Sequence, residues 1–143
     1  MNQKFAARRL LCILFVACLS LAQNSFAINA QTAHEFIKDQ QPQLLGDDSQ
    51  LVSLYYFGQH EDSAIVGLER VGDDYLPIRW LLIFKGERLL GWYYPCDEFP
   101  AKFDKGHLIF PKGSGVKSIY IYPEPPAYME IKGHRVAFKF LPE

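Results

Sequence analysis

The first change of pattern along the chain separates a targeting segment from the rest. Residues 10–22 form a nearly continuous apolar run, preceded by three basic residues and no acidic one. Ser25 and Ala27 then place small side chains three residues and one residue before a cleavage point. A basic start, a short apolar middle and a small-residue end are typical of a secretory signal peptide, and a run of this length is too short to span a bilayer as a helix. We therefore predict that residues 1–27 are a signal peptide cleaved after Ala27.

A weaker pattern inside the apolar run resembles a signal for attachment of a lipid. Residues 15–18, Phe-Val-Ala-Cys, loosely resemble the box in which bacterial lipoproteins carry their lipidated cysteine. Phe15 stands where such boxes have Leu, and apolar residues continue beyond Cys18. Contact with a membrane is therefore expected through the signal peptide, with a lipid on Cys18 as the less favoured alternative.

The mature chain begins with one short helical segment. Residues 31–39 are expected to form one or two turns of helix, for which Thr32 is the expected N-cap and Glu35 its capping-box partner. Pro42 is expected to end the helix, and a polar Gly-Asp-Asp-Ser loop follows it. We assign residues 28–49 to a short helix and a linker.

From residue 50 onward the hydrophobic pattern alternates with a period of two, and turn residues recur at short intervals. The segments that we expect as strands are 51–57, 64–69, 78–84, 88–94, 107–110, 117–122, 128–131 and 134–141. Six prolines in the second half shorten the strands there, and nothing suggests alternating helices and strands. The pattern predicts an all-β, mainly antiparallel domain over residues 50–143, built as a small β-sandwich or barrel of about seven or eight short strands. In the last segment, Val136, Phe138 and Phe140 are expected to form one half-buried face.

Aromatic residues are the main candidates for binding, because Tyr and Trp are enriched at binding surfaces. Alternation places Trp92 and Tyr94 on the same face as Leu90, with Tyr93 on the opposite face. The candidate binding residues are Trp92, Tyr93, Tyr94, Tyr120 and Tyr122. If Ile119 and Ile121 point into the core, Tyr120 and Tyr122 lie on an exposed sheet face, and the alternative is a second layer of core.

Charge narrows the class of partner. The whole chain has 15 basic and 16 acidic residues, but residues 1–27 contain three of the basic residues and none of the acidic ones. The mature domain therefore carries 12 − 16 = −4. This charge argues against a nucleic-acid partner and favours a basic protein partner.

Cleavage also changes the cysteine count from three to one, so the exported domain cannot form an internal disulfide. The remaining Cys96 follows a strand and precedes Asp97 and Glu98, whose charges disfavour the thiolate that a nucleophile requires. Cys96 is the candidate reactive thiol of the chain. A buried structural thiol is the favoured interpretation, and an intermolecular disulfide is the next.

Other chemical motifs are weak. His60-Glu61-Asp62 and the acidic pairs at residues 47–48 and 73–74 lack the spacing of known metal sites and are typical of solvated turns. Neither a Gly-x-Ser-x-Gly elbow nor a phosphate-binding glycine loop occurs. We therefore expect neither a cofactor nor a metal and assign no catalytic residue.

These observations lead to one preferred function and two alternatives. The preferred one is a small exported, periplasmic β-rich binding protein without catalytic activity, of the type that inhibits an envelope enzyme or confers immunity to it. The first alternative is a module that binds a carbohydrate or another small ligand through exposed Tyr and Trp residues. The second is a small hydrolase that uses Cys96 or a pair of carboxylates.

Overall fold

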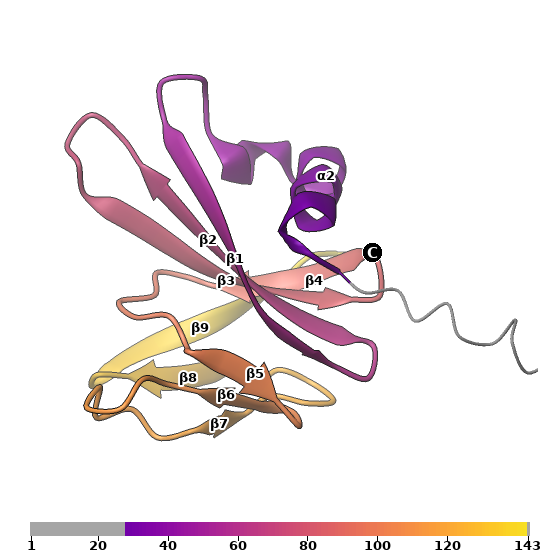
Figure 1. Ribbon diagram of the computed structural model, residues 1–143, viewed down its shortest axis with the longest axis vertical. Coiled ribbons are helices and arrows are strands. Elements are labelled where there is room, and N and C mark those ends of the chain that lie inside the picture. The colour runs from indigo at the N-terminus through magenta and orange to yellow at the C-terminus, as the bar shows by residue number, and fades with distance from the viewer. Residues whose placement is uncertain (1–27, 143) are drawn as a thin grey trace, which may run out of the picture.

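The computed structural model describes residues 28–142 (Figure 1). The predicted signal peptide and Cys18 lie outside these residues. The described part is mostly antiparallel β-structure with one short α-helix, as the sequence predicts, and it has nine strands in two sheets. No helix within residues 28–142 is long and apolar enough to cross a membrane.

The elements follow one another with short connections. In chain order they are α2 (Ala30–Gln40), the 3-10 helix η1 (Pro42–Leu45), β1 (Leu51–His60), β2 (Ser63–Val71), β3 (Pro77–Lys85), β4 (Arg88–Tyr93), β5 (Lys102–Asp104), β6 (His107–Ile109), β7 (Ile119–Tyr120), β8 (Tyr128–Ile131) and β9 (His134–Phe140). The larger sheet has the order β1-β2-β3-β4-β9-β8, and the smaller sheet has the order β5-β6-β7. All strand pairs are antiparallel.

Each of the eight predicted strand segments contains a strand, but three details differ from the prediction. β1 continues to His60, beyond the predicted end at residue 57, because residues 58–60 pair with the start of β2. The short strand β5 was not predicted, since Lys102–Asp104 carries a single apolar residue between two charged ones. β7 is limited to Ile119–Tyr120, although the alternating pattern extends over residues 117–122.

The N-terminal helix begins earlier than the sequence indicates. Asn29 is the N-cap, and its side-chain oxygen accepts a hydrogen bond from the backbone N–H of Thr32 at 2.9 Å. The Thr32 hydroxyl in turn accepts a hydrogen bond from the N–H of Asn29 at 2.9 Å. The prediction of Thr32 as the cap and Glu35 as its partner is therefore wrong by one helical turn. Asn caps a helix as well as Thr does, and the earlier start lets Ala33 pack against the sheet.

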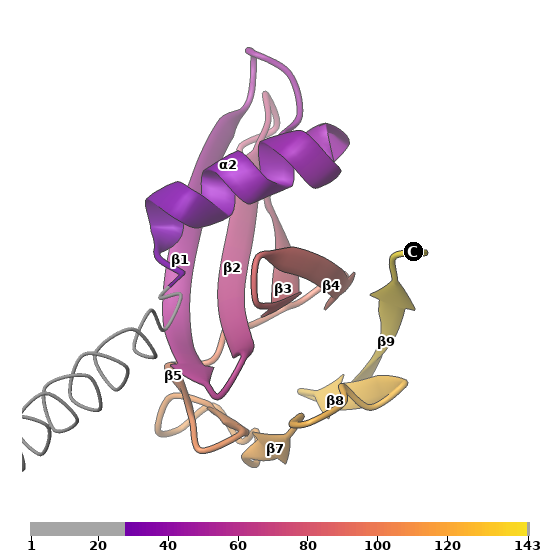
Figure 2. The same ribbon diagram turned by 90° about the vertical axis from the view of Figure 1, so that its right-hand side faces the viewer.

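The central strands β2 and β3 of the larger sheet are buried on both faces, so they contribute to two separate hydrophobic clusters. Figure 2 shows α2 lying across one face, with the smaller sheet near the opposite side. The cluster on the α2 face includes Ala64, Val66, Leu68, Trp80, Leu82 and Phe84. The cluster beneath the smaller sheet includes Ile65, Leu81, Ile83, Phe103, Leu108 and Ile121.

A β-bulge in β4 changes which residues share a face. Leu89 and Gly91 pair with consecutive residues of β3, so Leu90 is an extra residue in the ladder. Leu89 and Trp92 consequently belong to the cluster on the α2 face, whereas Leu90 packs against the cluster on the other face. The prediction that Leu90 and Trp92 share a face is wrong for this reason.

The predicted half-buried face of β9 extends over only part of the strand. Val136 is buried, and Phe138 is half-buried with its ring 4.9 Å from the ring of Tyr93. Phe140 is 56% exposed, which corrects the prediction at this position. Its cross-strand neighbour is Gly91, which has no side chain to cover it.

Candidate functional site

The three large apolar side chains with the highest exposure among the described residues lie at one end of the larger sheet, together with the less exposed Ile78. Tyr75 is 85% exposed, Leu51 76%, Leu76 65% and Ile78 37%. The loop between β2 and β3 carries Tyr75 and Leu76, and Figure 1 shows this hairpin projecting away from the smaller sheet. The ladder joins the start of β1 to the same end, because Leu51 pairs with Val71 at the end of β2. We call Leu51, Tyr75, Leu76 and Ile78 the hairpin tip.

Local hydrogen bonds order the loop that carries the hairpin tip. The N–H of Tyr75 donates to the carbonyl oxygen of Gly72 at 3.1 Å, and the N–H of Leu76 donates to Oδ1 of Asp74 at 3.1 Å. Tyr75 has φ = 57°, in the left-handed region that a bulky residue rarely adopts. Such strained residues cluster at binding and catalytic sites. The loop therefore presents Tyr75 in a defined conformation.

Four exposed carboxylates belong to the two loops beside the hairpin tip. They are Asp47 and Asp48 before β1, and Asp73 and Asp74 between β2 and β3. The side chain of Gln50 lies close to both loops, because a Cβ added to Gly72 would be 3.7 Å from its Nε2 atom and one added to Gly46 would overlap its Oε1 atom. The pKa of Asp47 is lowered, chiefly by hydrogen bonds from Ser49, so this carboxylate is ionised at neutral pH.

The arginines of β2 and β3 form contacts with other groups, although the charge of Arg70 also contributes to lowering the pKa of Asp47. Arg70 donates hydrogen bonds of 3.2 Å to the carbonyl oxygens of Gln43 and Leu44 in η1, and its guanidinium lies 4.8 Å from the ring of Trp80. Arg79 forms an ion pair of 2.7 Å with Glu69. The hairpin tip is therefore an apolar surface bordered by negative charge.

Two of the aromatic residues singled out in the sequence lie in the core. Trp92 is 6% exposed, with the Nζ atom of Lys139 5.2 Å from its ring. Tyr93 is fully buried, and its hydroxyl donates to the carbonyl oxygen of Pro126 at 2.7 Å. Burial raises the pKa of the Tyr93 phenol, and the neighbouring Cys96 adds to the shift. Neither ring has enough exposed area to contact a partner.

The other three aromatic candidates lie on the surface but are divided between two places. Tyr94 is 44% exposed and stacks on Trp80, on the α2 side of the larger sheet, at a centroid distance of 4.9 Å. Tyr120 is 54% exposed and lies 4.7 Å from the ring of His107 on the smaller sheet. Tyr122 is half-buried, with its ring 4.7 Å from that of His60. The fold thus does not join the five candidates into one surface.

Local charges also affect Tyr122. Its phenol pKa is raised, first by desolvation and then by the carboxylates of Glu61 and Asp62.

The described residues contain no group of three or more His, Cys, Asp or Glu side chains arranged to hold a metal ion.

Cys96 has the environment of a structural thiol. It is 4% exposed, and its Sγ atom donates to the carbonyl oxygen of Tyr93 at 3.5 Å. Burial raises the pKa of the thiol to about 12, and the charge of Asp97 adds to this effect, while a hydrogen bond with the Leu81 backbone and the charge of Arg79 oppose it. At neutral pH the group is therefore protonated and shielded from solvent, whereas nucleophilic cysteines are accessible thiolates.

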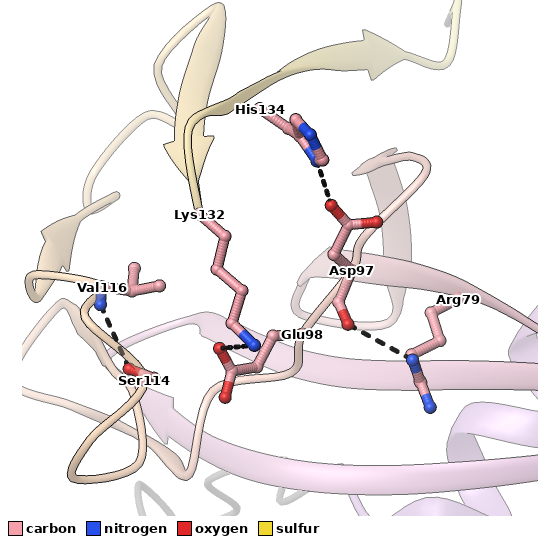
Figure 3. Close-up of polar contacts among 7 residues, drawn as sticks. All are labelled: Arg79, Asp97, Glu98, Ser114, Val116, Lys132 and His134. Atoms are coloured by element: carbon pink, nitrogen blue, oxygen red, sulfur yellow. Dashed lines mark hydrogen bonds and ion pairs between the residues drawn. The ribbon is translucent and has the colours of Figure 1, made fainter.

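A second feature is a groove between the two sheets, which we call the seam groove. It has a volume of about 450 Å³ and is lined on one side by residues 115–119 and on the other by β8 and the turn after it. Figure 3 shows two ion pairs beside it: Glu98 with Lys132 at 3.2 Å, and Asp97 with His134. The N–H of Val116 donates to the Ser114 hydroxyl at 3.2 Å on the opposite side.

Sequence reasoning missed both surfaces. The hairpin tip has a signal in the sequence, because Tyr75 and Leu76 are large apolar residues inside a turn, where polar residues are the rule. The seam groove has no such signal, since its two sides are brought together by the arrangement of the sheets. No protein-family model, curated protein or solved structure matches the chain.

Proposed function

We propose that this chain is a small exported binding protein without catalytic activity, which inhibits an envelope enzyme or confers immunity to it. The observation that carries the proposal is the hairpin tip, where Tyr75, Leu51 and Leu76 are each at least 65% exposed. Exposed apolar patches bordered by polar residues are typical of protein interaction sites. The partner is a basic protein.

A projecting, ordered loop suits insertion into a cleft of the partner. Aromatic residues that fill a pocket contribute most of the binding energy in many interfaces. The two hydrogen bonds within the loop hold Tyr75 in place before binding, which reduces the entropy lost on association. Tyr75 is therefore the residue that we expect to anchor the complex.

Charge supports a basic partner. The four carboxylates beside the hairpin tip are exposed, and the chain after residue 27 has a net charge of 12 − 16 = −4. Complementary charge accelerates the encounter of two proteins and disfavours partners of the same sign.

The proposal includes export and a barrel-like core. The basic and apolar pattern of residues 1–27 supports a signal peptide, and hence a periplasmic location for the rest of the chain.

A small open barrel is supported by the close approach of β5 to β1, where a Cβ on Gly58 would lie 2.3 Å from the carbonyl oxygen of Phe103. In such a barrel the seam groove is the side that remains open.

The glycan-binding alternative rests on Tyr94 and Tyr120, which expose 44% and 54% of their surfaces. A sugar platform requires aromatic faces that one ligand can reach together. These two rings lie on opposite sides of the larger sheet, so we favour the protein partner.

The test is a comparison of binding by two single variants. The exported chain is immobilised and incubated with an envelope extract from its own cells, and the retained protein is purified for calorimetry and an activity assay. We expect one stoichiometric basic protein whose enzymatic activity falls as the chain is added to a ratio of one to one. Tyr75→Ala should weaken the complex by about 2–4 kcal/mol, as loss of a central aromatic anchor does.

The matched control is Tyr120→Ala, which removes another exposed tyrosine from a different surface. It should change the dissociation constant by less than about threefold, a difference below 1 kcal/mol. Equal binding by wild type and Tyr75→Ala would count against the hairpin tip. A retained partner that keeps full activity at saturation would count against an inhibitory role.

A further inference from the structure

The seam groove separates the free edges of two sheets. β8 is the terminal strand of the larger sheet, and β7 is the terminal strand of the smaller one. Within residues 28–142 no backbone hydrogen bond joins β7 to β8. Free strand edges bind further strands readily, and proteins usually cover or disrupt them.

The hydrogen-bond pattern identifies the backbone groups of β8 that face the groove. The N–H of Phe138 donates to the carbonyl oxygen of Ala127 at 2.8 Å, so these residues form a hydrogen-bonded pair of the β8–β9 ladder. Such pairs alternate along an antiparallel ladder. The backbone groups of Met129 and Ile131 therefore point toward β9, whereas those of Tyr128 and Glu130 point toward the seam groove.

The same argument applies to β7. The N–H of Ile121 donates to the carbonyl oxygen of Gly106 at 3.0 Å, so this pair is hydrogen-bonded and the next pair, His107 with Tyr120, is not. The N–H and carbonyl groups of Tyr120 therefore point away from β6. The edge of β7 is therefore unpaired at Tyr120, the residue next to Ile119, which lines the seam groove.

The side chains that line the groove give it an apolar floor and a rim that carries both lysine and glutamate side chains. Met129 is 3% exposed, and Ile119 and Val116 are half-buried against the same cluster. Lys117 and Lys132 line the groove with one acid, Glu130. Glu98 pairs with Lys132, whereas no ion pair is formed by Lys117 within residues 28–142. An incoming acidic side chain would complement Lys117.

Contacts on both sides keep the groove open in a defined shape. The ion pairs Glu98–Lys132 and Asp97–His134 hold the turn between β8 and β9 against the segment after β4. A volume of about 450 Å³ lies within the range of sites that hold ligands. The groove can therefore accept an extended segment of a few residues without rearrangement of the sheets.

We propose that the seam groove binds an extended acidic peptide segment of a second protein as an added β-strand that joins the two sheets. Backbone hydrogen bonds to Tyr128 and Glu130 supply affinity, and alternate side chains of the segment contact the apolar floor, as in other cases of strand addition. The site is separate from the hairpin tip and does not depend on the function proposed for it.

The experiment selects ligands from a phage-displayed library of random twelve-residue peptides against the exported chain. Enriched peptides are synthesised with a fluorescent label, and their dissociation constants are measured by anisotropy. We expect sequences that alternate apolar and polar residues and carry at least one Asp or Glu. Glu130→Pro removes an N–H that faces the groove while leaving the bonds to β9 intact, so it should weaken binding at least tenfold.

Two controls separate the backbone from the side chain and from the rest of the protein. Glu130→Ala keeps the N–H and should change binding less than twofold, and Tyr75→Ala should leave it unchanged. Lys117→Gln should weaken binding at least threefold. With the wild-type chain, bound peptide should slow hydrogen exchange of the Glu130 amide, a readout that does not depend on how the proline variant folds.

Three results would overturn the proposal. They are the absence of any enriched peptide, equal binding of the enriched peptides to Glu130→Pro and Glu130→Ala with no protection of the Glu130 amide, and selection of basic in place of acidic sequences. Loss of peptide binding in Tyr75→Ala would place the peptide on the hairpin tip and would also overturn it.

Discussion

At the scale of single residues, the same side chain has different roles according to its position in the ladder. Tyr75 and Tyr93 are both tyrosines of the central hairpins, yet Tyr75 is 85% exposed and Tyr93 is fully buried. Tyr93 points into the cluster beneath the smaller sheet, and its hydroxyl donates a hydrogen bond to the backbone carbonyl oxygen of Pro126. Tyr75 lies in a turn beyond the last paired residues, so nothing covers it. Residue type alone therefore does not identify a binding aromatic residue.

Cys96 provides a prediction at this scale. Its folded pKa, about 12, lies above the ordinary thiol value of 9.0, so the folded state binds the proton more tightly than the unfolded state does. Stability from this group is complete below pH 9 and is lost as the pH rises toward 12. Between pH 8 and pH 10.5 the wild type should lose about 2 kcal/mol more free energy of unfolding than Cys96→Ala.

Urea denaturation at the two pH values measures this difference. The phenol of Tyr93 also has a raised pKa, but it is present in both proteins and its contribution largely cancels. Iodoacetamide should leave Cys96 unmodified in the folded chain at pH 8 and modify it in urea. Rapid alkylation of the folded chain would mean that the thiol is accessible, and the hydrolase alternative would regain support.

At the scale of elements, glycines decide where strands can approach one another. Gly91 lies in the bulge of β4 with φ = 157°, and a Cβ there would be 2.1 Å from the carbonyl oxygen of Lys139 in β9. The pairing of β4 with β9 joins the β8–β9 hairpin to the rest of the larger sheet. The absence of a side chain at Gly91 is therefore a condition for this sheet order.

We predict that Gly91→Ala destabilises the protein by at least about 2 kcal/mol, since backbone strain and a forced shift of β9 act together. The matched control is Gly113→Ala, at φ = 84° with no atom within 4 Å of the added Cβ. It should cost about 1 kcal/mol, from conformational strain alone. Thermal unfolding of both variants checks that Gly91→Ala loses more stability than Gly113→Ala. Equal losses of stability would show that the close approach of β4 and β9 tolerates a side chain.

At the scale of the whole molecule, the sequence predicts a targeting segment followed by an acidic domain. A near balance of 15 basic and 16 acidic residues conceals this division, because three of the basic residues lie before residue 28. The acidic residues of the domain include two groups with different positions. Four of them border the hairpin tip, while Glu98 and Asp97 hold the turn between β8 and β9. Acidic residues thus occur beside both proposed binding surfaces.

Export provides the prediction at this scale. When the complete chain is produced in cells with a secretion pathway, the intact mass of the exported product should correspond to residues 28–143, with no lipid and a free thiol. Ala27→Arg should block this cleavage, because signal peptidase requires a small residue there. A product that retains residues 1–27, or one that begins with a lipidated Cys18, would contradict the prediction.

The sequence predicted most of the local structure and little of the site. Alternation identified eight strand segments because each buries at least one face, and it failed at Leu90, where a bulge shifts the ladder by one residue. Two of the five aromatic candidates, Trp92 and Tyr93, are core residues, since both faces of the larger sheet are covered. Periodicity cannot tell a surface that faces water from one covered by a second layer.

The sequence by itself determined the antiparallel β class, the short helix and most of the turns, because these depend on interactions between residues that are near one another in the chain. Only the tertiary structure decided which tyrosines are exposed and that β7 and β8 face each other across a groove. Those properties depend on the order of strands and the position of α2. They arise from contacts between segments far apart in the chain, for which no single stretch of sequence carries a signal.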